Sequence, residues 1–173
     1  TENSIALVFA CPLFGAMFCI LAGRKTPGAC HPAAVLSMAG ALWGGVATLV
    51  RAIESETNEV SYLLGGWTLD AFPRGVGIEF RADLLASLIM LVVVGVGFLV
   101  ALYSKQPVSE ETPEKEGAYY SLFLLQVTGL AGICLTGDAF NLYVLIEVAA
   151  LTGYGLIAMG NARAAAATFN YVI

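Results

Sequence analysis

Apolar residues fill this 173-residue chain in long continuous stretches separated by shorter polar segments. Most stretches lack the alternation of apolar and polar positions that is typical of a half-buried strand. A helix needs about 20 apolar residues to cross a hydrocarbon core roughly 30 Å thick, where backbone groups cannot stay unpaired. The pattern therefore predicts an all-α integral membrane protein with a single membrane domain. We expect five complete spans at about 4–23, 32–50, 84–103, 118–136 and 139–160, and the start of a sixth at 164–173.

Residues 51–83 form the longest polar segment, which we expect to lie outside the membrane. Its first part, 51–59, is a charged loop in this interpretation. Further on, Val76, Ile78 and Phe80 alternate with more polar residues, which is the period of a strand. The Pro-Arg-Gly sequence at 73–75 is a turn signal. The sequence therefore predicts a small β-hairpin on the membrane surface before the third helix.

The segment 104–117 is acidic and contains prolines, so we expect a solvated, flexible loop there. Lysine and arginine beside the spans indicate the orientation. With the N-terminus outside, five of these residues lie inside and three outside. The inner five are Arg24, Lys25, Lys105, Lys115 and Arg163, and the outer three are Arg51, Arg74 and Arg81. This excess favours an N-terminus outside the membrane.

Composition supports the membrane interpretation and excludes other classes. The chain is 58% hydrophobic and 12% charged, whereas soluble domains carry about 25% charged residues. Its net charge of −5 argues against a nucleic-acid partner. The lipid bilayer is thus its expected surrounding. We interpret the four cysteines as small packing residues rather than as metal ligands or disulfides.

Glu147 is the strongest candidate for function, because it is the single charged residue inside any predicted span. It lies about eight residues into its span, which places it roughly 12 Å deep, near the bilayer midplane. A carboxylate at that depth costs about 2.5–3.5 kcal/mol on insertion scales, and such residues usually serve ion or proton movement. Helical spacing puts Tyr143 and Tyr154 on the same face, where their hydroxyls could bind the carboxylate or order water.

Two interpretations of Glu147 remain open from the residues alone. Burial raises the pKa of a carboxyl group and a nearby cation lowers it, so a group between these effects can exchange protons near neutral pH. The alternative is a structural acid, neutral or paired, that locks the packing of helices. The predicted spans contain no cation to pair with it.

Several other polar residues are secondary candidates. Asp138 is best placed to cap the fifth span by accepting backbone N–H bonds. Gln126, Thr128 and Thr136 in the fourth span could touch a hydrated path, or could bond neighbouring helices. His31 precedes the second span without a second ligand nearby.

Common enzyme signatures are absent from the sequence. It has no GxxxxGK[ST] phosphate loop, no HExxH, no GxSxG, and no pair of histidines to bind haem. We therefore expect no cofactor and no metal site, and we interpret the chain as a transporter subunit without a redox or hydrolytic site of its own.

Residues 136–160 closely resemble the fifth transmembrane helix of the antiporter-like membrane subunits. That family includes the D subunits of Mrp-type Na⁺/H⁺ antiporters and the proton-pumping membrane subunits of respiratory complex I and membrane-bound hydrogenases. The run Gly137-Asp138-Ala139-Phe140-Asn141-Leu142, with Glu147 and Tyr154, is most similar to the Mrp D branch. The resemblance is clear over about 64–173, and the first two spans match only in hydropathy.

The resemblance implies that Glu147 is the family's membrane-embedded glutamate, which exchanges protons and pairs with a lysine on the seventh helix. That lysine lies beyond the 173 residues, so we expect a fragment, a subunit completed by another chain, or a shortened relative. The implied partners are other membrane subunits and H⁺, with Na⁺ as a further candidate ion, in a bacterial or archaeal cytoplasmic membrane. Two alternatives remain: a scaffold subunit that does not transport, and a membrane subunit of a redox-driven pump.

Overall fold

The computed structural model describes residues 4–23, 25–64, 78–111, 113–160 and 162–172. Among these residues, five helices are long and apolar enough to cross a membrane. They are α1 (Ser4–Ala22), α2 (Cys30–Glu54), α3 (Leu84–Tyr103), α5 (Glu116–Leu135) and α6 (Ala139–Ala158). The predicted fold class is therefore confirmed. The shorter helices are η1 (Pro27–Ala29), α4 (Lys105–Glu111), η2 (Pro113–Lys115) and α7 (Ala162–Val172).

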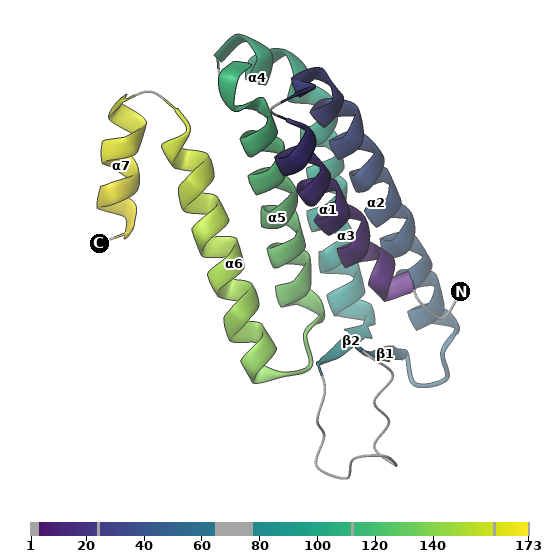
Figure 1. Cartoon of the computed structure of the whole chain (residues 1–173). Helices are drawn as coiled ribbons and strands as arrows, with labels where there is room; N and C mark the ends of the chain where they lie inside the picture. Colours follow the sequence, from purple (N-terminus) through teal and green to yellow (C-terminus); the bar gives the residue numbers. More distant parts are fainter. Residues whose placement is uncertain (1–3, 24, 65–77, 112, 161, 173) are drawn as a thin grey trace.

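The spans form a bundle in which α1 packs against α2 and α5, and α3 packs against α2. The core contains fully buried side chains from these four helices, among them Ile5, Met38, Met90, Tyr120 and Leu124. Figure 1 shows α6 at one edge of this bundle, beside α5, with α7 on its outer side. The arrangement gives α6 one packed face toward α5 and leaves much of its surface open.

Small residues allow α1 and α2 to approach each other closely. A Cβ on Gly40 would lie 2.8 Å from Sγ of Cys11, and one on Gly44 would lie 2.9 Å from Cβ of Leu7. Gly15 packs in the same way against Ser37. These small residues are thus used for packing between this chain's own helices.

The hairpin before α3 consists of two antiparallel strands, β1 (Glu59–Leu63) and β2 (Glu79–Asp83). The predicted strand residues 76–77 and the predicted turn at 73–75 lie outside the described residues. We expected a charged loop at 51–59. Instead α2 continues to Glu54, so the first part of this segment is helical. Phe80 of β2 is buried and stacks on Phe9 of α1 with ring centroids 4.4 Å apart. This contact anchors the hairpin to one end of the bundle (Figure 1).

The prediction of a flexible loop at 104–117 was wrong, because the segment forms α4 and η2. Val108 is buried against the core, so one turn of helix gains an apolar contact that composition did not reveal. Nε2 of Gln106 also donates to Oε1 of Glu110 one turn later, at 3.0 Å. These contacts hold a short helix across the end of the bundle opposite the hairpin (Figure 1).

Candidate functional site

Asp138 begins the helix that carries the candidate glutamate. Its carboxylate accepts hydrogen bonds from the backbone N–H of Phe140 at 3.1 Å and of Asn141 at 3.4 Å. Such a cap satisfies N–H groups that have no partner within the helix, and the positive helix end favours its charge. The capping interpretation of Asp138 agrees with this geometry. Asp83 caps α3 similarly, accepting from the N–H of Ala86 at 2.7 Å.

The short connection between α5 and α6 is also fixed to the hairpin. The N–H of Gly137 donates to the carbonyl of Glu79 at 2.9 Å, and Thr136 forms a β-bridge with Phe80. Within the connection, Nδ2 of Asn141 donates to Oγ1 of Thr136 at 3.0 Å. Asn141 is buried, and this hydrogen bond to Thr136 holds its amide in place. The start of α6 is therefore joined to both β2 and the end of α5.

Glycines of α5 let α6 pack closely against it. A Cβ on Gly129 would lie 3.1 Å from the backbone nitrogen of Ala149, and one on Gly132 would lie 2.6 Å from Cδ2 of Leu145. Contact at backbone distance fixes which side of α6 faces α5. The packed side of α6 includes Leu145 and Ala149 and continues to Thr152.

A hydrogen bond between the spans reinforces this packing. The hydroxyl of Thr152 donates to Oε1 of Gln126 at 2.7 Å, linking α6 to α5, and lies equally close to the carbonyl oxygen of Val148 in its own helix. Gln126 was a candidate from the sequence, whereas Thr152 was missed. Thr152 could have been found from the short connection between the two spans. That connection makes the spans an antiparallel pair, which places Gln126 and Thr152 at similar depth. Thr128 instead donates to the carbonyl of Leu124 in its own helix at 2.8 Å.

Glu147 lies near the middle of α6, on the side that faces away from α5. At 100° per residue it is about 160° from Ala149 on the helical wheel. Its side chain is exposed on the surface of the bundle, next to the exposed Ile146 and Val144. It forms neither an ion pair nor a hydrogen bond with any side chain that the structure describes.

The two tyrosines predicted beside Glu147 have different surroundings. Tyr143, one turn before Glu147, is 62% exposed and shares its open face. Tyr154 packs edge-to-face on Tyr171 of α7, with ring centroids 5.8 Å apart. Among the described residues, neither hydroxyl bonds to the Glu147 carboxylate. The structure thus brings Tyr143 and Glu147 to one surface and directs the ring of Tyr154 toward α7.

His31 belongs to a different part of the molecule. Its Nε2 is 3.1 Å from the carbonyl oxygen of Ala101, and its ring packs edge-to-face on the buried Tyr120. Cys19 and Cys30 are also buried nearby, and each thiol contacts the other's backbone carbonyl, at 3.6 and 3.8 Å. These residues join α1, α2, α3 and α5 rather than approach Glu147 on α6.

The fold and the position of Glu147 define an integral membrane protein with an ionisable group halfway along one of its helices. No family model matches the chain. It is 36% identical to the N subunit of NADH-quinone oxidoreductase from Desulforudis audaxviator, over all of this chain and 33% of that protein. It is 38% identical to the D subunit of the Na⁺/H⁺ antiporter from Bacillus subtilis over 100 residues, which are 58% of this chain and 19% of that protein.

Solved structures share the fold. A chain of the membrane-bound sulfane sulfur reductase, an archaeal respiratory membrane complex, superposes with a TM-score of 0.81 at 28% identity, covering 99% of this chain and 34% of that one. A chain of the Mrp complex from Dietzia sp. gives a TM-score of 0.74 at 25% identity, covering 99% and 31%.

This chain is therefore a homologue of the antiporter-like membrane subunits, which include the D subunits of Mrp-type antiporters and the N subunits of NADH-quinone oxidoreductase. It spans about a third or less of the length of these relatives, and this coverage fits their N-terminal part. The predicted resemblance is confirmed and extends further than expected. The match to the oxidoreductase relative covers the first two helices as well as the later ones.

Proposed function

We propose that the chain is part of a subunit of a multisubunit cation/proton antiporter or ion-pumping respiratory complex. In this proposal, Glu147 exchanges protons during translocation of H⁺, or of Na⁺ against H⁺. The observation that carries the proposal is the position of Glu147. It lies near the middle of a membrane-length helix, on the face turned away from α5, without a partner among the described side chains.

The energetics of that position support a functional partner outside the described bundle. An ionised carboxylate facing lipid is unfavourable by about 2.5–3.5 kcal/mol unless a cation pairs with it. A cation on an adjoining helix or protein would offset this cost by pairing with the carboxylate. Glu147 would release its proton when such a cation approached, and would bind a proton again when the cation moved away. By resemblance to the family, this cation is a lysine.

Polar residues along α6 give the proposed path an entrance. Asp138 and Asn141 lie at one end of the helix, and Tyr143 lies between them and Glu147 on the exposed side. The Tyr143 hydroxyl can relay a proton or hold a water beside the carboxylate. Gln126 and Thr152 lie on the opposite side of α6, toward α5. We assign them to positioning the helix rather than to carrying protons.

A redox-driven complex is the second candidate, because a membrane subunit of an NADH-quinone oxidoreductase matches the whole chain. In that setting Glu147 keeps the same proton-exchanging role, and only the energy source differs. Ion-gradient-driven exchange without any electron donor would distinguish an antiporter from a redox-driven pump.

We further propose that the complex lies in a bacterial or archaeal cytoplasmic membrane with the N-terminus outside. Lys25, Lys105 and Lys115 then lie on the cytoplasmic side, and Arg51 and Arg81 lie on the outer side. Labelling of single introduced cysteines with an impermeant maleimide tests this orientation. A cysteine at exposed Glu56 should react in intact cells, whereas one at exposed Lys25 should react only after permeabilisation.

The test of Glu147 uses the complete protein in its complex, reconstituted into vesicles. Glu147→Gln should lower ΔpH- or Na⁺-driven exchange by at least about tenfold while the complex assembles normally, because the amide cannot exchange a proton. Glu147→Asp should retain part of the activity. The matched control is Glu56→Gln, which removes an exposed carboxylate outside the spans. Wild-type exchange by a fully assembled Glu147→Gln complex would refute the proposal.

A further inference from the structure

One face of α3 is apolar and exposed along the whole helix. Its residues are spaced four, three, four, three and four positions apart, which keeps them in one stripe. The stripe consists of Leu85, Ile89, Val92, Val96, Leu99 and Tyr103, and each of these side chains is exposed. It ends at Tyr103, the last residue of α3 and an aromatic residue of the type that gathers at membrane–water boundaries.

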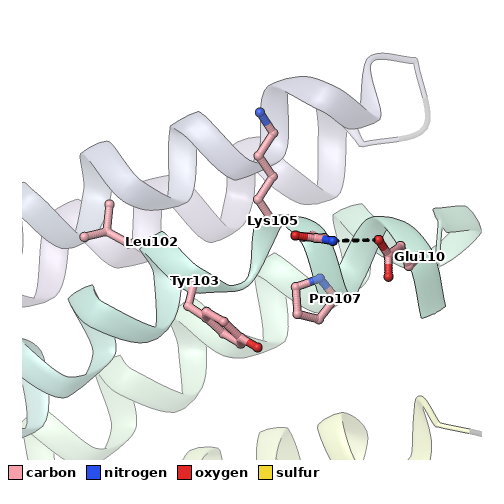
Figure 2. A pocket seen from close by; sticks show the side chains of 6 residues that line it. Leu102, Tyr103, Lys105, Pro107 and Glu110 are labelled. Carbon is pink, nitrogen blue, oxygen red and sulfur yellow. Dashed lines mark hydrogen bonds between the residues drawn. The ribbon is translucent and has the colours of Figure 1, made fainter.

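A pocket of about 480 Å³ lies where this stripe ends, in the bend between α3 and α4. Its lining comprises Leu102, Tyr103, Lys105, Gln106, Pro107 and Glu110. Figure 2 shows Lys105 and Tyr103 extending in opposite directions from the bend, with Glu110 on the α4 side. The pocket lining therefore combines an aromatic residue that continues the apolar stripe with two charged residues.

The charged residues of the lining are one cation, Lys105, and one anion, Glu110. Glu110 is fixed by the hydrogen bond from Gln106 at 3.0 Å, which uses one of its carboxylate oxygens and leaves further acceptor sites. Lys105 is exposed and forms no ion pair with the described residues. A ligand that complements the pocket thus needs an anionic group, a cationic N–H donor and an apolar tail.

We propose that this pocket and the α3 stripe bind a glycerophospholipid with a primary amine headgroup, of the phosphatidylethanolamine type. The phosphate pairs with Lys105, the ammonium donates hydrogen bonds to Glu110, and an acyl chain lies along Leu99 and Val96. Tyr103 marks the level of the glycerol backbone. The proposal is independent of the role assigned to Glu147.

Charge complementarity selects this lipid over the other common classes. An anionic lipid such as phosphatidylglycerol satisfies Lys105 and leaves Glu110 facing negative charge. Phosphatidylcholine carries a cation without N–H groups, so it cannot donate to the carboxylate. A transmembrane helix of another protein would cover the stripe but would offer no fixed pair of charges at its end.

The test uses the complete protein in its complex, purified in detergent and examined by native mass spectrometry after addition of each lipid. Phosphatidylethanolamine should stay bound at concentrations about tenfold below those needed for phosphatidylcholine or phosphatidylglycerol. A photoactivatable phosphatidylethanolamine with its reactive group in the acyl chain should label α3 near Leu99. Equal retention of the three lipids, or occupation of the stripe by a neighbouring protein, would overturn the proposal.

Charge reversal separates this site from general lipid binding. Lys105→Glu and Glu110→Lys should each weaken retention of phosphatidylethanolamine about tenfold or more, without changing the unfolding temperature measured in lipid-free detergent. The matched control is Lys25→Glu, which makes the same charge change at an exposed position in the α1–α2 connection. A loss of the same size in the Lys25→Glu protein would contradict a specific headgroup site.

Discussion

The Thr152 hydroxyl of α6 donates a hydrogen bond to Oε1 of Gln126 in α5 at 2.7 Å. Thr152 is five residues after Glu147, so the two side chains point about 140° apart around the helix. A contact that holds Thr152 toward α5 therefore also turns Glu147 away from it. The rotation of α6 is set by this bond together with the glycine contacts of Gly129 and Gly132.

Removing this hydrogen bond should loosen α6. Thr152→Val keeps the shape of the side chain and should lower the free energy of unfolding by about 0.6–2 kcal/mol, the range found for hydrogen bonds between membrane helices. Denaturation in mixed detergent micelles measures this change. Thr128→Val is the control, because the Thr128 hydroxyl bonds within α5. A double change of Thr152→Val and Gln126→Leu that is fully additive would show that the two residues do not interact.

Close packing of α5 and α6 should be sensitive to a single methyl group. Gly129→Ala places a Cβ 3.1 Å from the Ala149 nitrogen, so the backbone of α6 must shift, at a cost of about 1–3 kcal/mol. Gly95→Ala in α3 is the control, since a Cβ there meets no atom within 4 Å among the described residues. Thermal unfolding in detergent should separate the two variants. Equal stability would contradict the close approach of the helices.

The cap of α6 gives a third prediction. Asp138→Ala removes the acceptor for two backbone N–H groups and should destabilise the protein by about 0.5–2 kcal/mol. Asp138→Asn should retain most of the stability, because an asparagine side chain also caps helices well. Hydrogen exchange of the first turn of α6 measures the effect locally. Wild-type protection in the alanine variant would show that the cap contributes little.

The hairpin should depend on pH through one ion pair outside the spans. Arg81 donates to both carboxylate oxygens of Glu59, at 2.5 and 2.9 Å, and lowers the pKa of Glu59 from its ordinary value of 4.5. Because the folded pKa is the lower one, the contribution is fully present above about pH 5 and is lost as pH falls through the folded pKa. Protection of the β1 amides, corrected for intrinsic exchange, should decline in that acidic range.

Glu59→Gln is the matched control for this pH effect. It removes the titrating group but keeps a polar side chain opposite Arg81, so its β1 amides should show the lower protection at every pH. Because both side chains are partly exposed, added salt should also weaken the wild-type effect. An unchanged acidic decline in the Glu59→Gln protein would assign the effect to another group.

Local features of the fold could be predicted from the sequence. Continuous apolar stretches located the five membrane-length helices of the described residues, and an aspartate just before an apolar run indicated the cap at Asp138. Alternation indicated the strand at Phe80. The partner strand β1 and the helix α4 were missed, because their stability comes from contacts with distant residues. Val108 is one example: its burial against the core holds a turn that its own sequence neighbourhood does not favour.

The sequence by itself determined that this is a membrane protein, where the five membrane-length helices of the described residues lie, and that Glu147 lies halfway along α6. Each of these follows from the length and composition of one segment at a time. Only the tertiary structure decided which side of α6 packs on α5, and hence that Glu147 and Tyr143 face outward. The physical reason is that lipid and a neighbouring helix are both apolar, so hydropathy does not tell the two faces apart. The backbone contact at Gly129 and the hydrogen bond between Thr152 and Gln126 distinguish the two faces.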